Sequence, residues 1–206
     1  MLEHVPHWLG SLLHNVRAGH AKLAIVQEGI VTGDARLELG SIAFGGGGRL
    51  PVRFTADGEG VSPPLSWSGV PADASALALI VEDPDAPTPN PLVHAVVWNL
   101  PPGDGGLAEG AIAPDGHGLF DGADVGRNSY MQEGWLPPDP PTGHGSHDYV
   151  FQLFALREAV QLDRDPGRTD VLEAIRGRVI AAGILVGTYS RGEESPVEPS
   201  VVARTA

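Results

Sequence analysis

Residues 92–100 read Leu-Val-His-Ala-Val-Val-Trp-Asn-Leu, a run in which only His94 and Asn99 are polar. A strand with one solvated face alternates apolar and polar residues, whereas a run without alternation is typical of a strand buried on both faces. Two further runs, 76–81 and 149–156, are also rich in Val, Leu, Ile and aromatic residues and are bounded by turn-forming residues. We therefore predict three core strands in these segments.

Helical patterns occur only toward the two ends of the chain. Residues 5–17 carry apolar residues at helical spacing until Gly19, which predicts a short amphipathic helix. A second helix is predicted to begin at Asp170, with Glu173 in a capping-box-like position, and to end at Gly183. Its apolar face comprises Val171, Leu172, Ile175 and Val179.

The order of these elements predicts the fold class. A final strand is expected over 184–189, and the polar, Pro-containing residues after Ser190 are expected to form a flexible tail. Long connections rich in Pro and Gly separate the predicted strands and argue against regular βαβ crossovers. The predicted fold is therefore mainly β: an antiparallel β-sandwich with peripheral helices.

The composition excludes several classes of function. The chain of 206 residues has a formal net charge of −13, which disfavours binding to nucleic acid or to an anionic membrane surface. It contains no Cys, so disulfides, thiolate metal sites and cysteine nucleophiles are excluded. Lys22 is its only lysine and no P-loop motif occurs, which argues against Schiff-base and P-loop chemistry. Because no run approaches the roughly 20 apolar residues of a membrane span and no secretory signal is found, we expect a cytoplasmic protein without stable membrane insertion.

Groups suited to chemistry concentrate in two segments. Residues 82–87, Glu-Asp-Pro-Asp-Ala-Pro, end one predicted strand, and residues 140–149 open another. The carboxylate of Asp83 needs hydrogen-bond donors, although an ordinary Asp-Pro turn is the alternative interpretation. His94 lies in an apolar strand and must place both ring nitrogens in hydrogen bonds. Asp83 is its expected partner; on residue type alone, a satisfied core histidine is the alternative.

Histidines occur in two groups, and each group is a candidate set of metal ligands. His144 and His147 form an H-x-x-H pattern in a Gly-rich loop, where this spacing does not place both side chains on one face. Together with Asp83 and His94 they are a candidate Asp/His metal site, but such clusters also bind anions or water. The N-terminal histidines are interpreted as solvated helix residues, and neither a metal nor a cofactor is predicted. These histidines are His4, His7, His14 and His20.

At the same two segments the sequence resembles the phosphatidylethanolamine-binding protein family, in particular the bacterial and archaeal branch often labelled Raf-kinase-inhibitor-like. The most specific match is Asp-Pro-Asp-Ala-Pro (83–87), followed by the strand histidine at 94 and by a Pro-Pro-x-Gly-x-Gly-x-His-x-Tyr run (140–149). The order and spacing agree over roughly residues 40–191. Further matching stretches are VSPPLSW (61–67), GRNSY (126–130) and LVGTYSR (185–191).

The resemblance implies a β-sandwich with a small, anion-accepting pocket at one end of a sheet. It also implies a cis peptide bond near Ala86-Pro87. Carried over residue by residue, the residues that line the pocket or shape its loop are Asp83, Asp85, Pro87, His94, Pro141, His147 and Tyr149.

This sequence departs from the family pattern in three places. Asp148 stands where the family usually has Arg, which adds negative charge beside the pocket and is expected to weaken phosphate binding. The strand histidine is flanked by Val93 and Ala95 rather than by aromatic residues, so a roomier cavity is expected. Residues 1–39 lie outside the match. The expected organisation is therefore an N-terminal helical extension (1–39), a family domain (40–191) and a flexible tail (192–206).

We hypothesise that the protein binds a small phosphate-, carboxylate- or sulfate-bearing molecule or headgroup in the Asp/His pocket, more tightly at mildly acid pH. The expected cause is that Asp83 raises the pKa of His94. An enzyme that uses Asp83, His94 and His147 for general acid/base chemistry is the alternative. A protein-interaction or inhibitor module is a second alternative, and a homodimer built on the N-terminal helix is a further possibility.

Overall fold

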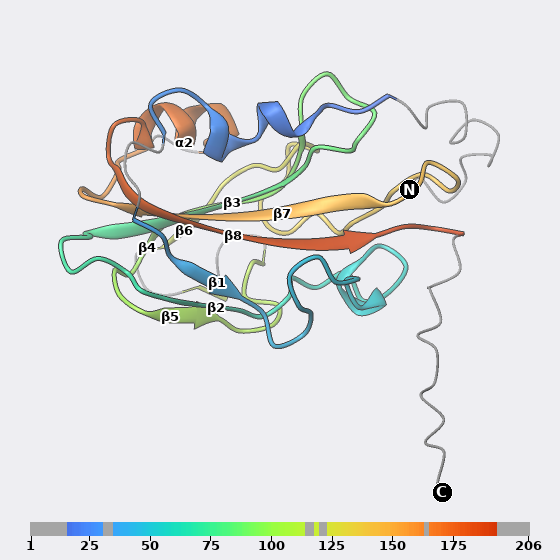
Figure 1. The fold of residues 1–206 in the computed structure, drawn as a ribbon, viewed down its shortest axis with the longest axis horizontal. Coiled ribbons are helices and arrows are strands. Elements are labelled where there is room, and N and C mark those ends of the chain that lie inside the picture. The colour runs from blue at the N-terminus through green and yellow to red at the C-terminus, as the bar shows by residue number, and fades with distance from the viewer. Residues whose placement is uncertain (1–15, 31–34, 114–117, 120–122, 163–164, 193–206) are drawn as a thin grey trace, which may run out of the picture.

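The computed structural model describes residues 16–30, 35–113, 118–119, 123–162 and 165–192. Two antiparallel sheets pack face to face, as the sequence predicts (Figure 1). One sheet has the strand order β6-β4-β3-β7-β8, and the other has the order β1-β2-β5. The strands are β1 (Glu38–Gly40), β2 (Leu65–Ser68), β3 (Ala76–Asp83), β4 (Leu92–Leu100), β5 (Gly105–Leu107), β6 (Asp124–Val125), β7 (His147–Leu156) and β8 (Val179–Tyr189).

The larger sheet is buried on both faces, which explains the missing alternation in the sequence. In β3, Leu77 and Leu79 pack into the core between the two sheets. Ala78 and Ile80 point to the opposite face and pack into a second core. There α2 (Arg168–Ile175) and the N-terminal segment cover the sheet (Figure 1). Each strand residue therefore meets an apolar layer whichever way it points.

The two polar residues of β4 mark its two irregularities. Val81 pairs with Ala95 and Glu82 pairs with Val93, so His94 is an extra residue in a β-bulge. The second shift in register lies beside Asn99, which has a φ of 55°. Its side-chain amide donates to the Val160 carbonyl oxygen at 3.0 Å. Because a bulge redirects a side chain, His94 points toward the end of the sheet rather than continuing the strand pattern.

The helices differ from the prediction in their bounds. α2 ends at Ile175 rather than near Gly183, and β8 already begins at Val179. The chain reverses at Gly177, which has a φ of 72°, so the apolar run continues as a strand and not as a helix. The predicted helix over 5–17 lies, except for its last two residues, outside the described residues. None of the described helices is long and apolar enough to cross a bilayer. The 3₁₀ helices are η2 (His20–Lys22), η3 (Ala24–Val26) and η4 (Val52–Phe54).

The end of β8 is more firmly held than the prediction of a tail after Ser190 implies. Arg191 is 9% exposed and forms ion pairs with Asp57 and Asp139. Arg49 donates to the Ser190 carbonyl oxygen at 2.9 Å. The ordered structure therefore extends past Ser190, and the predicted tail lies, except for Gly192, outside the described residues.

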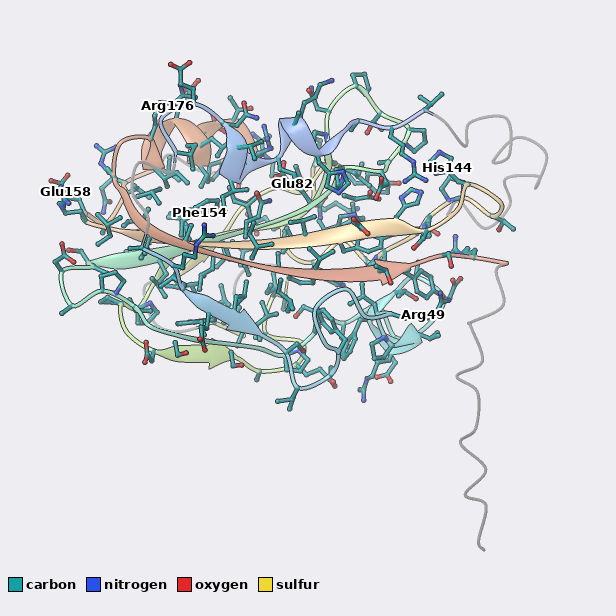
Figure 2. All side chains as sticks on the ribbon, viewed as in Figure 1. Arg49, Glu82, His144, Phe154, Glu158 and Arg176 are labelled. Atoms are coloured by element: carbon teal, nitrogen blue, oxygen red, sulfur yellow. The ribbon has the colours of Figure 1, made fainter. Side chains whose placement is uncertain are left out.

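Glu82 joins the N-terminal segment and α2 to the sheet. Its carboxylate is fully buried and accepts hydrogen bonds from the backbone N–H of Ala24 and the side chain of Gln152, both at 2.7 Å. It also forms an ion pair with Arg168 at the start of α2. Figure 2 shows Glu82 between the sheet and the layer above it. A buried charge is tolerated here because three donors satisfy it.

We predict that Glu82→Ala lowers the free energy of unfolding by about 3 kcal/mol, because Arg168 and Gln152 would lose their buried partner. The matched control is Glu158→Ala, since the Glu158 side chain is 71% exposed and pairs with Arg178 at the far end of the sheet (Figure 2). This control is expected to change stability by less than about 0.5 kcal/mol. Urea unfolding monitored by circular dichroism measures both variants, and equal effects would contradict the prediction.

Candidate functional site

The predicted site residues meet where β3 ends and β7 begins. Asp83 is the last residue of β3 and His147 is the first residue of β7. The two strands are neighbours in register, with Glu82 paired to Val150. Tyr149 lies two residues after His147 and therefore on the same face of the strand. The antiparallel pairing of β3 with β7 thus brings together side chains that are 64 positions apart in the sequence.

Asp83 organises the loop that follows β3. Its Oδ1 accepts hydrogen bonds from the backbone N–H groups of Asp85 and Ala86, at 2.8 and 2.9 Å. The expected cis bond near Ala86-Pro87 is wrong, because no described peptide bond is cis. The turn is instead held by the carboxylate of Asp83, with trans peptide bonds throughout. Pro87 follows this turn and is partly buried.

The expected pairing of Asp83 with His94 is also wrong. Asp83 Oδ2 accepts a hydrogen bond from Nδ1 of His147 at 2.7 Å. Nδ1 of His94 lies 2.6 Å from the carbonyl oxygen of Leu136, and the backbone N–H of Leu136 donates to the His94 carbonyl oxygen at 2.7 Å. The bulge in β4 aims the His94 ring at this neighbouring loop, so a backbone carbonyl takes the place of the carboxylate.

His144 extends the Asp83–His147 pair into a chain of three groups. Nδ1 of His144 and Nε2 of His147 are 2.6 Å apart, so one proton lies between the two rings. His144 is fully buried, and its backbone N–H donates to the carbonyl oxygen of Pro141 at 3.0 Å. In the sequence, the H-x-x-H pattern indicates that His144 belongs to the same cluster as His147. The turn after Pro141 lets both histidines face each other although they do not lie on a helix.

His94 is a neutral imidazole with one unused nitrogen. Burial lowers the pKa of His94 below its ordinary value, and this effect outweighs the neighbouring charge of Asp83, which raises it. The expectation of a raised pKa is therefore wrong. A carbonyl oxygen can only accept, so Nδ1 carries the hydrogen toward Leu136 and Nε2 holds a lone pair. Within the described part of the chain, this Nε2 is buried without a hydrogen-bond partner.

Tyr149 presents a second unused polar group beside His94. The two ring centroids are 5.1 Å apart in an edge-on arrangement. The Tyr149 side chain is fully buried, and its hydroxyl has no hydrogen-bond partner among the described residues. Burial, followed by the charge of Asp83, raises the pKa of Tyr149 well above its ordinary value, so the phenol stays neutral and can donate a hydrogen bond. A nitrogen lone pair and a phenol hydroxyl, both buried, therefore belong to two neighbouring rings.

Aromatic neighbours of His94 come from other elements than its own strand. The ring of Trp135 lies 6.0 Å from the His94 ring, and Tyr149 covers another side. Trp135 also stacks on Phe151 of β7 at 6.0 Å. The imidazole of His94 therefore has aromatic contacts although its flanking residues, Val93 and Ala95, are small.

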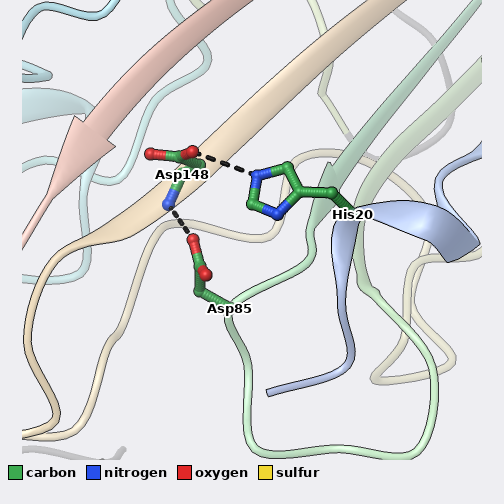
Figure 3. Close-up of side chains that lie close together, drawn as sticks. All are labelled: His20, Asp85 and Asp148. Carbon is green, nitrogen blue, oxygen red and sulfur yellow. Dashed lines mark hydrogen bonds and ion pairs between the residues drawn. The ribbon is translucent and has the colours of Figure 1, made fainter. Parts of the chain in front are cut away.

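The rim of the site is built by Asp85 and Asp148 together with the N-terminal segment (Figure 3). The backbone N–H of Asp148 donates to Asp85 Oδ2 at 2.7 Å. His20 Nε2 lies 3.1 Å from Asp148 Oδ2, and Arg17 forms an ion pair with Asp85. His20 was interpreted as a solvated residue; it is largely exposed but paired. No signal in the sequence linked Arg17 or His20 to the loops of the site.

His20, Asp85 and Asp148 are also the described residues best arranged to hold a metal ion. One ligand atom from each lies within 4.8 Å of the others. Both carboxylate oxygens of Asp85 are already engaged, one with Arg17 and one with a backbone N–H. The cation of Arg17 therefore competes directly with any metal ion at this place, and the expectation of no metal stays a prediction.

Surface hollows also occur away from these groups. Two of them, of about 350 and 640 Å³, share Arg127 and Asp170 in their linings and lie along α2. His94 and Tyr149 line neither hollow, but the buried Nε of Arg127, which lines both, also has no hydrogen-bond partner among the described residues. Buried polar groups without partners are rare in folded proteins. One of them lies at these hollows, whereas two lie in the neighbouring rings of His94 and Tyr149.

Comparisons with known proteins agree with this architecture. Residues 40–190 match the family model described as phosphatidylethanolamine-binding protein. A protein of Methanothermobacter thermautotrophicus, named UPF0098 protein, is 44% identical over 156 residues, which are 76% of this chain and 100% of that protein. The crystal structure of Escherichia coli YbcL, described as a member of the mammalian PEBP family, has a TM-score of 0.71 and 30% identity and covers 76% of this chain and 99% of its own. The PEBP homologue CT736 of Chlamydia trachomatis has a TM-score of 0.68 and 37% identity over 79% of this chain and 100% of its own.

We predict that His94 titrates below 6.5, the ordinary pKa of histidine, and that its neutral form carries the hydrogen on Nδ1. Because the folded state takes up this proton less readily than the unfolded state, the contribution of His94 to stability is present above pH 6.5 and is lost as pH falls through its folded pKa. Nitrogen-15 NMR of the imidazoles, with His94→Gln to assign the signal, measures both properties. A hydrogen on Nε2, or titration above 6.5, would contradict this prediction.

Proposed function

Because the chain belongs to the phosphatidylethanolamine-binding protein family, we propose that it binds a small molecule carrying a phosphate, sulfate or carboxylate group, which His94 and Tyr149 hold. Three buried side-chain atoms have no hydrogen-bond partner among the described residues: His94 Nε2, the Tyr149 hydroxyl and Arg127 Nε. The observation that carries the proposal is that the first two belong to neighbouring rings, whose centroids are 5.1 Å apart. Leaving a buried donor or acceptor unsatisfied costs roughly 1–3 kcal/mol per group. A bound oxyanion would offset that cost at both groups.

The groups proposed to contact the ligand donate hydrogen bonds, or can do so after protonation, and they are not carboxylates. The charge of Asp83 is already compensated by two backbone N–H groups and by His147. The hydroxyl of Tyr149 can donate to an anionic oxygen as it stands. His94 can donate only after Nε2 takes up a proton, or it can accept a hydrogen bond from an oxyanion that still carries one. A hydrogen phosphate or phosphomonoester monoanion fits the neutral form, and a fully ionised anion fits the protonated form.

Because the protein encloses these groups, only a small part of the ligand would contact them. His94 is 1% exposed and Tyr149 is fully buried, so the head of the ligand would enter while the remainder stays outside. Recognition of a headgroup by a few buried donors is the usual design of small-molecule sites.

Sulfate is the sharpest probe of this proposal because it stays doubly ionised from pH 5.5 to 8. We expect binding of sulfate to take up one proton, because a bound dianion raises the pKa of His94 from its lowered value in the free protein. The affinity should therefore increase as pH falls, by up to about tenfold per pH unit, until pH reaches the pKa of free His94. Isothermal titration calorimetry in buffers of different ionisation enthalpy measures both affinity and proton uptake.

Variants separate the two groups. His94→Gln is expected to abolish the pH dependence, whereas Tyr149→Phe should weaken sulfate binding about 10- to 100-fold at every pH, the usual effect of losing one hydrogen bond to a charged group. The control is Ser75→Ala, which also removes a hydroxyl. Ser75 precedes β3 at the end opposite Asp83, and its hydroxyl donates to the Arg157 carbonyl oxygen at 2.7 Å; this variant should bind within twofold of the wild type. A pH-independent affinity that neither His94→Gln nor Tyr149→Phe changes would refute the proposed site.

A further inference from the structure

The N-terminal segment runs along both loops of the site, although it lies outside residues 40–190 that match the family model. The backbone N–H of Ala18 donates to the Ala86 carbonyl oxygen at 3.0 Å, and that of Gly19 donates to the carbonyl oxygen of Pro84 at 2.8 Å. Arg17 donates to the Ser146 carbonyl oxygen in the other loop at 3.2 Å. The segment therefore bridges the loop after β3 and the loop before β7.

Further contacts fasten this segment to the sheet on the C-terminal side of Arg17. The N–H of Ala24 donates to Glu82 and the N–H of Ile25 donates to Gln152, at 2.7 and 2.8 Å. Arg168 of α2 donates to the Lys22 carbonyl oxygen at 2.7 Å. The backbone on both sides of η2 is thus hydrogen-bonded to the rest of the protein, and this holds Arg17 in place.

Three carboxylates around the site each have a basic partner. Asp83 is paired with His147 inside the site. At the rim, Asp85 is paired with Arg17. Asp148 is paired with His20, as Figure 3 shows. Both rim carboxylates therefore find their basic partners in the N-terminal segment and not in the sheet. Without these partners, two negative charges would face an approaching anion.

We propose that Arg17 is a specificity-determining residue that allows the site to accept an anion. This inference rests on the proposed function. The guanidinium neutralises Asp85, whose carboxylate is linked through the Asp148 N–H to the residue next to His147. The N-terminal segment is in this way a part of the binding site. Its contribution is electrostatic, so it acts on charged ligands through space and needs no contact with them.

The test uses the full-length chain and sulfate at pH 6.0. Arg17→Gln is expected to weaken sulfate binding about three- to tenfold, because one positive charge near the ligand is lost. Arg17→Lys should keep the wild-type affinity, and Asp85→Asn should restore affinity in the Arg17→Gln background by removing the charge left unpaired. The loss in Arg17→Gln should shrink as salt is raised above 0.1 M, where the screening length is about 10 Å.

The matched control is Arg178→Gln, because Arg178 pairs with Glu158 on the surface at the far end of the sheet. It changes the net charge of the protein equally and should leave sulfate affinity within twofold of the wild type. Thermal unfolding of every variant detects loss of structure.

The outcomes separate this inference from the proposed function. If the wild type binds sulfate and Tyr149→Phe weakens binding, while Arg17→Gln binds as the wild type does, the role of Arg17 is overturned and the proposed function stands. If Asp85→Asn does not restore affinity in a variant that is as stable as the wild type, the electrostatic cause is wrong. If the wild type binds no sulfate at any pH, both proposals fail.

Discussion

The buried carboxylate of Asp83 is the constraint around which this end of the molecule is built. A carboxylate that is 3% exposed cannot remain ionised without donors. Two donors come from the backbone of its own turn, and the third is the imidazole of His147. These bonds fix the path of the chain after β3 and attach it to the first residue of β7. The geometry of the remaining groups follows from this choice of partners.

His147 is engaged by Asp83 and His144. Beside it, among the residues that the structure describes, His94 Nε2 and the Tyr149 hydroxyl have no hydrogen-bond partner. The bulge in β4 is the local cause, since it turns His94 away from the carboxylate and toward the Leu136 carbonyl oxygen. That carbonyl also fixes the tautomer of the ring. The result is a neutral imidazole that differs from the charged Asp–His pair expected from the neighbouring strands. Under the proposed function, this neutral state makes proton uptake a part of binding a dianion.

The sequence could predict the strands and the grouping of site residues, because both depend on local patterns. Apolar runs without alternation identified β3, β4 and β7, and the motifs at 82–87 and 140–149 flank the ends of β3 and β7 that meet. The pairing inside the site could not be predicted, because it depends on a one-residue bulge at His94 and on a backbone carbonyl 42 positions away. The bounds of α2 failed for a related reason: an apolar run around Val179 suits a helix face and a buried strand equally well.

The net charge of −13 describes the whole chain but not the potential at the site. Each carboxylate at this end of the sheet has a basic partner within hydrogen-bond reach, so the local field depends on how completely these pairs neutralise one another. Asp148, which was expected to repel anions, is paired with His20, and Asp85 is paired with Arg17. The effect of Asp85 or Asp148 on the local potential therefore depends on its basic partner in the N-terminal segment, which is far away in the sequence. Under the proposed function, the effect of Asp148 on an anion therefore depends on the N-terminal segment that lies against it.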